Sequence, residues 1–535
     1  MDFVFGTLST DRLRLLHHSL LRQGLQHAHN ITPRDPMPGK PVTLTVRAGQ
    51  NLPVDHVACY YTTDGSLPSG SRGVAANGEV IQFERLSQDW DIPAWGYAAT
   101  WRCAIPGQSD NTLVRYKISA WVDDGDEVYA DWPDFELTVE RASALSSRGE
   151  PLPDDVGVVL PGGKVFTLHV DTYTLPQWVR DAVIYHIFVD RFHPGGDRDW
   201  MQTDDLYDFF GGTLWGIQEK IKYIADLGAD CIWLSPTFVC HSYHGYDVID
   251  YQKTDPRMGG DEALHALVAA AHERGIRVIL DLVCNHSSHK HPYFLDAQAD
   301  PNSPHRDWYT FDDSKLGYRS FFGVKSMPKI NLDNPEARAW MLAVAQFWLR
   351  EFDVDGYRLD YAHGVGPDFW SEFRKACREV KSDSFCFGEI IQAPSEQLAY
   401  VGRLDGLLDF HLEDALRKTY AWGVMSEREF QQFADLHLSY FPTDFAMPTF
   451  LDNHDTDRFL HIANGDKAAL RRAAAAQFQL PGPPIIYYGT EVGLSQNAGR
   501  AEGDGLEESR LPMLWGDDQD QALLDFYKGL IKSRR

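Results

Sequence analysis

The stretch RVILDLVCNH, residues 277–286, decides the fold, because an apolar run here ends abruptly in polar residues. Near-continuous apolar runs are expected of strands in a parallel sheet, since both faces of such a sheet are covered. A second run of the same kind, VDGYRLD at residues 354–360, also ends in charged residues. Amphipathic helical patterns alternate with such runs along the chain, and this alternation is typical of βα units.

Eight runs of this kind occur between residues 177 and 535, and together they predict an α/β fold of the (β/α)8 TIM-barrel type. The runs are AVIYHIFV (182–189), CIWLSP (231–236), RVILDLV (277–283), VDGYRLD (354–360), FCFGE (385–389), GLLDFH (406–411), MPTFLDN (447–453) and PPIIYYG (483–489). The stretch from about 285 to 335 is too polar and too rich in Pro and Gly for a plain loop and helix. It predicts a small inserted subdomain after the third strand.

The chain before the barrel divides into three segments by composition. Residues 1–32 carry leucines at helical spacing and predict an N-terminal helix. Residues 33–140 show short alternating runs separated by Gly, Pro and Asp, which predict a β-sandwich domain. Residues 141–176 are rich in Ser, Gly, Pro and Asp and predict a linker. The tryptophans of the sandwich would either fill its core or stack on sugar rings, so a carbohydrate-binding role stays open.

Composition limits the partners of this chain of 535 residues. Its net charge of −27 repels nucleic acid and anionic membranes, and no stretch reaches the roughly 18 apolar residues needed to cross a bilayer, so we expect neither partner. The seven cysteines lack metal-type spacing and the first residues lack a signal-peptide pattern, which predicts a cytoplasmic location. A Cys59–Cys103 bridge and a homodimer both stay open.

Polar residues gather where four of the predicted strands end, on the face where barrels carry their reacting groups. An isolated acid at a strand end is commonly a helix cap. Several acids that converge with an arginine and histidines indicate a functional site, because clustered like charges cost stability unless function requires them. The residues are Asp281, Asn285 and His286 on the third strand, Arg358 and Asp360 on the fourth, Glu389 on the fifth, and Asp452, His454 and Asp455 on the seventh.

A glycosidase needs such a set of groups. One carboxylate attacks the anomeric carbon, while a second carboxyl protonates the leaving oxygen and then acts as a base towards water. Arg358 stands two residues before Asp360, so both side chains share one face of a strand and the arginine can hold the carboxylate ionised. Neutral histidines can donate hydrogen bonds to sugar hydroxyls.

The order of these motifs resembles glycoside hydrolase family 13, the α-amylase family, over roughly residues 177–535. The segment MPKIN, residues 327–331, is similar to one in the neopullulanase, cyclomaltodextrinase and maltogenic amylase branch, whose members often carry an N-terminal β-domain. Tyr243 stands where α-glucosidases that trim chain ends carry an Asp, which argues against a purely exo-acting enzyme. The matching motifs, in order, are GGTLWGI (211–217), DLVCNH (281–286), GYRLD (356–360), FGEI (387–390), FLDNHD (450–455) and PGPPIIYYGTE (481–491).

The resemblance implies a role for each reacting group. It makes Asp360 the nucleophile, Glu389 the general acid/base and Asp455 the third carboxylate, which grips hydroxyls of the sugar being cleaved. It implies that Arg358 orients Asp360. Asp281 would pair with Arg358 rather than react.

The same resemblance implies the residues that surround the sugar. His286 and His454 would bind its hydroxyls, and Tyr246 would stack beneath its ring. The chemistry requires no cofactor, while Asn285 matches a position that binds calcium in many family members. The implied function is retaining hydrolysis of α-1,4 glucosidic bonds in starch-derived glucans or maltooligosaccharides, with α-1,6 bonds left open.

Two alternative functions use the same fold. An α-glucanotransferase or a disaccharide isomerase would pass through the same covalent glucosyl intermediate and differ only in the acceptor. A non-catalytic carbohydrate-binding barrel is the remoter alternative, because relatives of that kind lose catalytic acids that this chain keeps.

Overall fold

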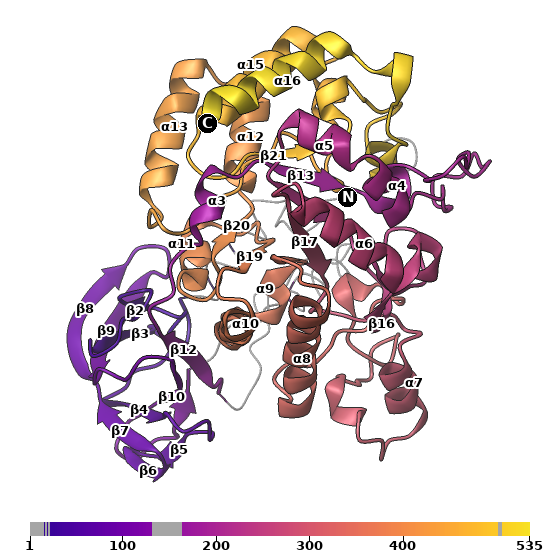
Figure 1. Cartoon of the computed structure of the whole chain (residues 1–535). Coiled ribbons are helices and arrows are strands. Elements are labelled where there is room, and N and C mark those ends of the chain that lie inside the picture. The colour runs from indigo at the N-terminus through magenta and orange to yellow at the C-terminus, as the bar shows by residue number, and fades with distance from the viewer. Residues whose placement is uncertain (1–14, 16–18, 20–21, 131–137, 139–162, 501–504) are drawn as a thin grey trace.

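The computed structural model describes residues 15, 19, 22–130, 138, 163–500 and 505–535. An all-β front domain, drawn in indigo and purple, lies beside a larger body of helices and strands that runs from magenta to yellow (Figure 1). Strand β12 (Phe166–Val170) of the front domain packs against helix α10 (Pro367–Val380) of the larger body. The two parts therefore share an interface built from specific elements.

Two five-stranded antiparallel sheets and a small two-stranded sheet, β5-β6, form the front domain. The remaining strands are β1 (Leu25–Gln26), β2 (Ile31–Thr32), β3 (Val42–Ala48), β4 (His56–Thr62), β5 (Ser69–Ser71), β6 (Val74–Asn77), β7 (Glu79–Gln82), β8 (Glu84–Asp91), β9 (Gly96–Ile105), β10 (Thr112–Trp121) and β11 (Val128–Tyr129). One sheet runs β1-β3-β9-β8 with β2 beside β3, and the other runs β11-β10-β4-β7 with β12 beside β10. Every second residue of β3 is buried, as expected of a strand with one face on a core. The expected β-sandwich is present.

Parts of two segments differ from the assignments made from the sequence. In the segment 1–32, predicted as a helix, Leu15 and Ser19 are helical, but the segment ends in strands β1 and β2, which both pair with β3. The segment 141–176, predicted as a linker, contains β12, which is buried throughout and pairs with β10. Its Phe166 and Val170 join the sandwich core, and this burial outweighs the Gly- and Pro-rich composition around them. The remainder of both segments lies largely outside the described residues.

Seven parallel strands form the sheet of the larger body, in the order β20-β19-β18-β17-β14-β13-β21. They are β13 (Ile184–Ile187), β14 (Cys231–Leu234), β17 (Arg277–Leu282), β18 (Gly356–Leu359), β19 (Phe385–Gly388), β20 (Gly406–Leu407) and β21 (Ile485–Tyr487), and the hairpin β15 (Phe238–Cys240) and β16 (Val248–Thr254) follows β14. The segment 446–449 closes the ring, because Gly406 bridges to Ala446 and Thr449 bridges to Pro484. All eight predicted runs therefore supply barrel strands in chain order, and the (β/α)8 barrel is confirmed.

Helices surround the barrel and cover the outer face of its strands (Figure 1). The α-helices besides α10 are α3 (Gln177–Asp181), α4 (Leu214–Glu219), α5 (Ile221–Leu227), α6 (Gly260–His272), α7 (Pro292–Ala299), α8 (Pro335–Glu351), α9 (Ala362–Val365), α11 (Pro394–Gln397), α12 (Phe410–Tyr420), α13 (Glu427–Ser439), α14 (Phe459–Ile462), α15 (Lys467–Gln479) and α16 (Gln521–Arg534). Every residue of β13, β14, β18 and β19 is buried, which explains their apolar sequences. Local sequence also sets the helix ends: Asn334 caps α8 by accepting two backbone N–H bonds, and Pro335 takes its first position.

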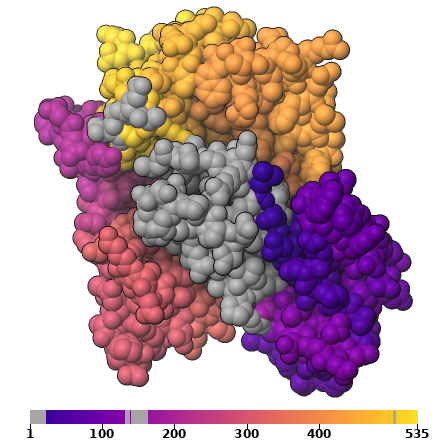
Figure 2. Space-filling view, turned by 180° about the vertical axis from the view of Figure 1, so that it is seen from behind, coloured from indigo at the N-terminus to yellow at the C-terminus, as the bar shows by residue number. Residues whose placement is uncertain are grey.

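The inserted subdomain follows β17, as predicted. It contains α7 and two 3-10 turns, η3 (Arg306–Trp308) and η4 (Phe321–Gly323). A single antiparallel β-bridge joins His286 to Lys329, near the two ends of the subdomain. Seen from behind, this subdomain and the front domain lie on opposite sides of the lower half of the molecule (Figure 2).

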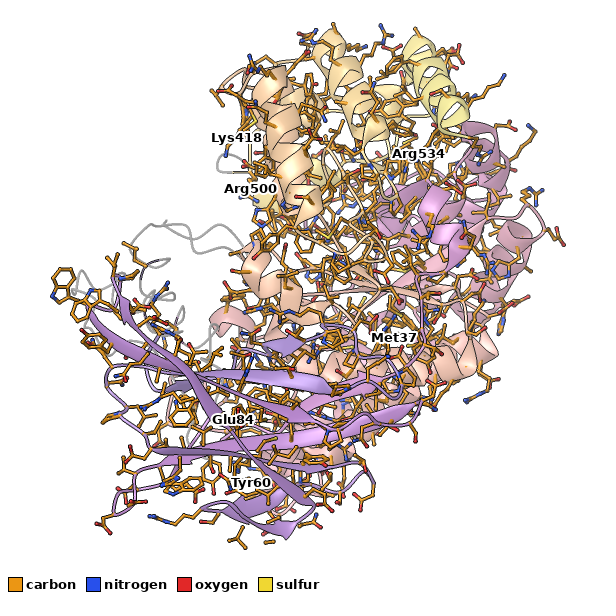
Figure 3. All side chains as sticks on the ribbon, turned by 90° about the vertical axis from the view of Figure 1, so that its left-hand side faces the viewer. Met37, Tyr60, Glu84, Lys418, Arg500 and Arg534 are labelled. Atoms are coloured by element: carbon orange, nitrogen blue, oxygen red, sulfur yellow. The ribbon has the colours of Figure 1, made fainter. Side chains whose placement is uncertain are left out.

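Two properties of the whole fold bear on the expectations from composition. All seven cysteines are free and buried, so no Cys59–Cys103 bridge is formed. Among the described residues, no helix has both the length and the apolar content that a membrane crossing requires. Figure 3 views the sandwich from the side, with Tyr60 and Glu84 on its strands and Arg534 on the barrel.

Candidate active site

Arg358 lies at the centre of the candidate site, at the carboxyl end of β18. Its Nη1 donates to both oxygens of Asp281, at 2.8 and 2.9 Å, and to Oδ1 of Asp360 at 3.1 Å. Its Nη2 donates to Oε2 of Glu389 at 2.6 Å. One guanidinium group therefore binds carboxylates from three neighbouring strands.

The register of the barrel strands explains this convergence. Asp281 of β17 pairs with Arg358 of β18, and Arg358 pairs with Phe387 of β19. Asp360 and Glu389 each lie two residues beyond a member of this row, so their side chains point to the same side of the sheet. The positions of these residues within their motifs therefore bring Asp281, Arg358, Asp360 and Glu389 together at one end of the barrel.

Three of the carboxylates keep contact with solvent. The side chains of Asp455, Asp360 and Glu389 are 20%, 12% and 8% exposed. Those of Arg358 and Asp281 are 0% exposed. A molecule that enters from solvent can reach the first three groups, whereas Asp281 is confined to binding the arginine. The pairing with Arg358 that was expected of Asp281 is present.

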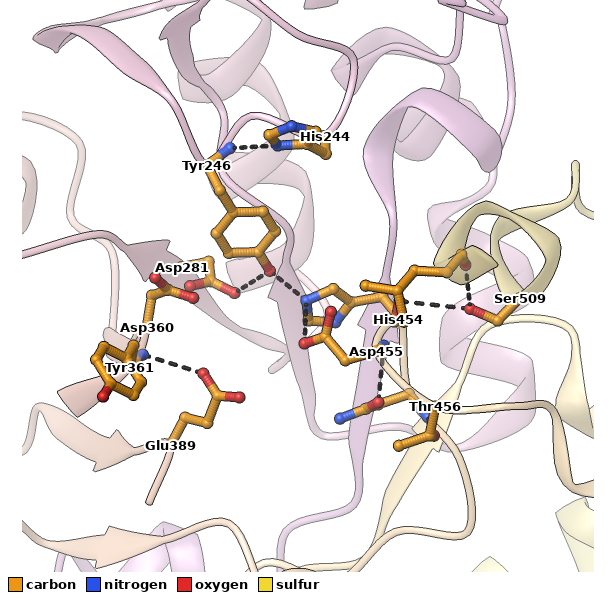
Figure 4. Close-up of polar contacts among 12 residues, drawn as sticks. His244, Tyr246, Asp281, Asp360, Tyr361, Glu389, His454, Asp455, Thr456 and Ser509 are labelled. Atoms are coloured by element: carbon orange, nitrogen blue, oxygen red, sulfur yellow. Dashed lines mark hydrogen bonds and ion pairs between the residues drawn. The ribbon is translucent and has the colours of Figure 1, made fainter. Parts of the chain in front are cut away.

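The turn after β18 positions Glu389. The backbone N–H of Tyr361 donates to Oε2 of Glu389 at 3.0 Å (Figure 4), and the N–H of Ala362 donates to the Glu389 carbonyl oxygen at 3.1 Å. Tyr361 has a φ of 38°, in the left-handed region where a side chain of this size costs on the order of 1–3 kcal/mol. Backbone strain of this kind concentrates where the surrounding structure holds a reacting group in place.

Asp455 is held from both sides. Nε2 of His454 lies 3.1 Å from its Oδ2, and Nη2 of Arg510 donates to its Oδ1 at 3.2 Å. The Tyr246 hydroxyl lies 2.6 Å from the same histidine nitrogen and donates to Oδ2 of Asp281 at 2.9 Å (Figure 4). The rings of Tyr246 and His454 are stacked, with centroids 5.3 Å apart. This network connects Asp455 to the carboxylates around the buried guanidinium.

The three reachable acids differ in protonation. Burial raises the pKa of Asp360; Arg358 opposes this effect and the neighbouring Glu389 adds to it. Burial also raises the pKa of Glu389, again against Arg358. Because like charges at close range oppose each other's ionisation, this pair titrates as a unit, and the proton on one carboxyl depends on the charge of the other. Burial acts to raise the pKa of Asp455 too, but His454 and Arg510 hold it below its usual range, so this acid is ionised.

His286 lies beside the inserted subdomain, apart from the acid network. Its ring stacks on Phe321 with centroids 4.8 Å apart, and burial lowers its pKa to about 3, so it is neutral. Its Nδ1 lies 3.3 Å from Nδ2 of Asn285, which places the ring proton on Nε2. Within the described residues that Nε2 has no hydrogen-bond partner, so it can donate to a ligand.

Asn285 is the residue at which calcium was expected. Its Oδ1 is buried and also lacks a hydrogen-bond partner in the described part of the chain. Calcium takes roughly six to eight oxygens, usually including carboxylates. Across residues 22–130, 163–500 and 505–535, no three His, Cys, Asp or Glu side chains stand close enough to hold a metal ion.

Asp452 does not join the site, although it ends a predicted strand. Its carboxylate accepts the backbone N–H of Phe459 at 2.8 Å and the hydroxyl of Thr490 at 2.9 Å. It fixes the start of α14, which is the ordinary use of an acid at a strand end.

A further set of contacts supports Asp455 and His454 from behind and was not predicted from the sequence. It is made by Arg510, Glu507 and Tyr243. Nη1 of Arg510 donates to the Tyr243 hydroxyl at 2.9 Å, and that hydroxyl donates to Oε1 of Glu507 at 3.0 Å. Nε of Arg510 donates to the backbone carbonyl of His454 at 2.8 Å. No spacing pattern signals these contacts, because residues 243 and 510 meet only when the two ends of the barrel close.

Comparison with known proteins agrees with the geometry. The family described as "Alpha amylase, catalytic domain" matches residues 186–525, which is more than half of the chain. Alpha-amylase 2 of Dictyoglomus thermophilum is 43% identical over 371 residues, covering 69% of this chain and 65% of that protein. A cyclomaltodextrinase of Geobacillus thermopakistaniensis is 36% identical over 388 residues, with the same two shares of 69% and 65%.

A solved structure of a cyclomaltodextrinase matches with a TM-score of 0.64 at 26% identity, covering 96% of this chain and 84% of that one. The chain spans about 65% of the length of the two curated relatives. Most of the barrel, the ordered motifs and the cluster around Arg358 lie within the matched range. This chain belongs to the alpha-amylase family, and it is similar to members named cyclomaltodextrinase, maltogenic amylase and neopullulanase.

Proposed function

We propose that this chain is a retaining glycosidase that hydrolyses α-1,4 and α-1,6 glucosidic bonds in starch-derived glucans or maltooligosaccharides. The observation that carries the proposal is that Arg358 binds Asp360 and Glu389 at once, at 3.1 and 2.6 Å, while both acids stay reachable from solvent. The names of similar proteins, such as cyclomaltodextrinase and neopullulanase, support this substrate class.

The proposed reaction has two displacements. Glu389 gives its proton to the glycosidic oxygen while the ionised Asp360 attacks the anomeric carbon, so the bond to the leaving sugar breaks and a glucosyl ester of Asp360 forms. Glu389, now ionised, then takes a proton from water as the water oxygen attacks the anomeric carbon and releases Asp360. Two inversions at one carbon retain the α configuration. The raised pKa of Glu389 favours the protonated form that the first step needs, and Arg358 favours the ionised form of Asp360.

The remaining residues would hold the sugar. Asp455, kept ionised by His454 and Arg510, can accept two sugar hydroxyls. His454 and His286 would donate to hydroxyls, and Tyr246 would present its ring to an apolar sugar face. The reaction uses no cofactor, since every proton and charge in it is supplied by these side chains or by water.

We also propose that the tip of the β8–β9 hairpin binds glucan. The side chains of Trp90, Trp95 and Tyr97 are 46%, 75% and 60% exposed, and Trp90 contacts the other two rings edge-on. The turn is braced, because Asp91 accepts the Ala94 N–H at 2.8 Å, and Trp95 has a φ of 52°. Large aromatic rings held in solvent by a strained turn suit stacking on sugar rings.

Two further expectations are part of this proposal. The seven free cysteines support a reducing, cytoplasmic compartment. A homodimer is the competing use of the exposed hairpin rings, and sedimentation velocity with and without those rings distinguishes the two.

Digestion of starch, pullulan, cyclodextrins and maltotriose tests the proposed function. We expect new reducing ends from several of these substrates, and an added acceptor sugar should change the product pattern little. Quantitative transfer to the acceptor would instead identify a glucanotransferase. Absence of cleavage and transfer on the whole panel would contradict the proposal.

A further inference from the structure

The front domain binds the first turn of α10 through one buried carboxylate. Oδ2 of Asp368 lies 3.0 Å from Nε2 of His29, and its Oδ1 accepts the backbone N–H of Thr167 at 2.6 Å. His29 and Thr167 belong to the sandwich, whereas Asp368 belongs to the barrel. All three residues are buried, at 0%, 1% and 2% exposed.

The charges make this contact specific. Burial lowers the pKa of His29 to about 4, so the ring is neutral at pH 7 and donates through Nε2. Burial acts to raise the pKa of Asp368, but His29 and Lys164 hold it well below its usual range, so the carboxylate is ionised. A buried ionised group is stable only where its partners are in place, because an unpaired one pays its full desolvation cost. The contact therefore favours one placement of α10 against the sandwich.

Further hydrogen bonds join α10 to the front domain and to α8. Oε1 of Glu372 accepts from Arg115 of β10 at 3.1 Å and from Arg338 of α8 at 2.7 Å. The Ser371 hydroxyl donates to the Thr167 carbonyl oxygen at 3.3 Å. The front half of α10 is thus bonded to the sandwich through Asp368, Ser371 and Glu372, which lie on its first two turns.

The same helix is tied to the catalytic turn. Nε1 of Trp370 donates to the carbonyl oxygen of Ala362 at 2.9 Å. Ala362 directly follows Tyr361, whose N–H donates to Glu389. Gly366, with a φ of 90°, turns the chain sharply from α9 into α10. The connection between the Tyr361 turn and α10 is therefore short. A continuous set of bonds therefore leads from His29 to the carboxyl of Glu389.

We propose that Asp368 is a positioning residue: by anchoring α10 to the front domain, it keeps the strained Tyr361 turn in place and so aims Glu389 at the leaving oxygen. The front domain then contributes to catalysis without touching the substrate. The catalytic half of this inference rests on the proposed function, in which Glu389 is the acid. The mechanical half, that Asp368 holds the Tyr361 turn, does not.

The test compares two substrates that differ in their need for an acid. Maltotriose requires protonation of its leaving oxygen, whereas α-maltosyl fluoride has a leaving group that departs with little help. We expect Asp368→Ala in the full chain to lower kcat on maltotriose roughly tenfold, a part of what a general acid supplies. The rate of fluoride release from α-maltosyl fluoride in the first turnover, before Glu389 acts as a base, should change less than about twofold. Asp368→Asn keeps the acceptor for Thr167 and should retain most of the maltotriose activity.

Three further measurements make the result decisive. His56→Gln removes an exposed His–Asp pair of the same domain, with Asp123 at 2.8 Å, and should change neither substrate. Trp370→Phe removes the bond from Trp370 to the Ala362 carbonyl oxygen. It should lower activity on maltotriose but not on the fluoride, and it tests the proposal even if Asp368→Ala fails to fold. Amide hydrogen exchange of a peptide containing Tyr361 should be faster in Asp368→Ala than in wild type.

An equal loss on both substrates, or unchanged exchange at Tyr361, would overturn the proposed anchoring. If wild type cleaved neither substrate, the proposed function would fail, while the exchange measurement would still decide the mechanical half.

Discussion

Arg358 lies closer to Glu389, at 2.6 Å, than to Asp360, at 3.1 Å. The resemblance to the α-amylase family implied that this arginine orients Asp360, and the structure adds that it also binds Glu389, for which we propose the acid role. The guanidinium can therefore stabilise negative charge on either carboxyl. This suits a reaction in which Asp360 is ionised first and Glu389 afterwards.

The first prediction concerns stereochemistry. We expect the first product from an α-glucan to be the α-anomer, because two displacements retain configuration. NMR spectra recorded before mutarotation measure which anomer forms first. The carboxyls of Asp360 and Glu389 should lie roughly 5–5.5 Å apart in a crystal structure with bound sugar. Asp360→Asn should lower kcat on the order of 10⁴-fold or more with an unchanged circular dichroism spectrum. A β-anomeric first product would rule out retention even if the variant were inactive.

The second prediction concerns the acid. Glu389→Gln should lower kcat on maltotriose by roughly 10²–10⁴-fold, because it removes the proton donor. The loss should be much smaller for formation of the covalent intermediate from α-maltosyl fluoride, measured by release of fluoride in the first turnover. Equal losses on the two substrates would remove Glu389 from the acid role.

The third prediction concerns pH and stability. The folded state raises the pKa of Glu389 above its ordinary value of 4.5, so it binds this proton more tightly than the unfolded chain does. The stabilisation is complete below pH 4.5 and is lost as the pH rises towards the folded pKa. The Tm of Glu389→Gln minus that of wild type should therefore rise with pH across this window. A difference that falls with pH would contradict the raised pKa.

The fourth prediction concerns Arg510. Its bond to Asp455 is charge-assisted, and such bonds contribute about 1.5–3 kcal/mol, so Arg510→Ala should lower kcat/KM roughly tenfold to a hundredfold. Arg500 is the matched control, because its Nη1 donates to the backbone carbonyl of Asp455 at 2.8 Å and not to the carboxylate. Arg500→Ala should cost less than Arg510→Ala in the same kinetic assay; the reverse order would show that the carboxylate contact is unimportant.

The fifth prediction concerns the front domain. If the hairpin rings bind glucan, Trp95→Ala should weaken binding to amylose in affinity electrophoresis while leaving the KM for maltotriose unchanged. Trp422→Ala removes an exposed tryptophan of the barrel, 46% exposed, and serves as the control. A loss of dimer in Trp95→Ala, with unchanged amylose binding, would assign the hairpin to self-association.

The sequence alone predicted the barrel, and the resemblance of its motifs to the α-amylase family supplied the candidate reacting groups. Apolar runs of the kind seen at residues 277–283, repeated in alternation with helical patterns, indicate parallel strands, and such strands end at one edge, where Asp360 and Glu389 were expected to meet. The two-residue spacing of Arg358 and Asp360 determined that they share a face. These conclusions depend on short-range periodicity, which a single chain displays in full.

Only the tertiary structure decided the contacts between distant segments. Three of these contacts join residues far apart in the chain. His169 of β12 lies 58 positions from its partner Asn111, Tyr243 lies 267 positions from Arg510, and His29 lies 339 positions from Asp368. The composition around β12 and around His29 suggested a linker and a helix instead. Such contacts are set by how the two sheets and the closed barrel pack, and the side chains involved are single polar groups with no repeating pattern. Their energy comes from burial and mutual pairing, which exist only once the domains have come together.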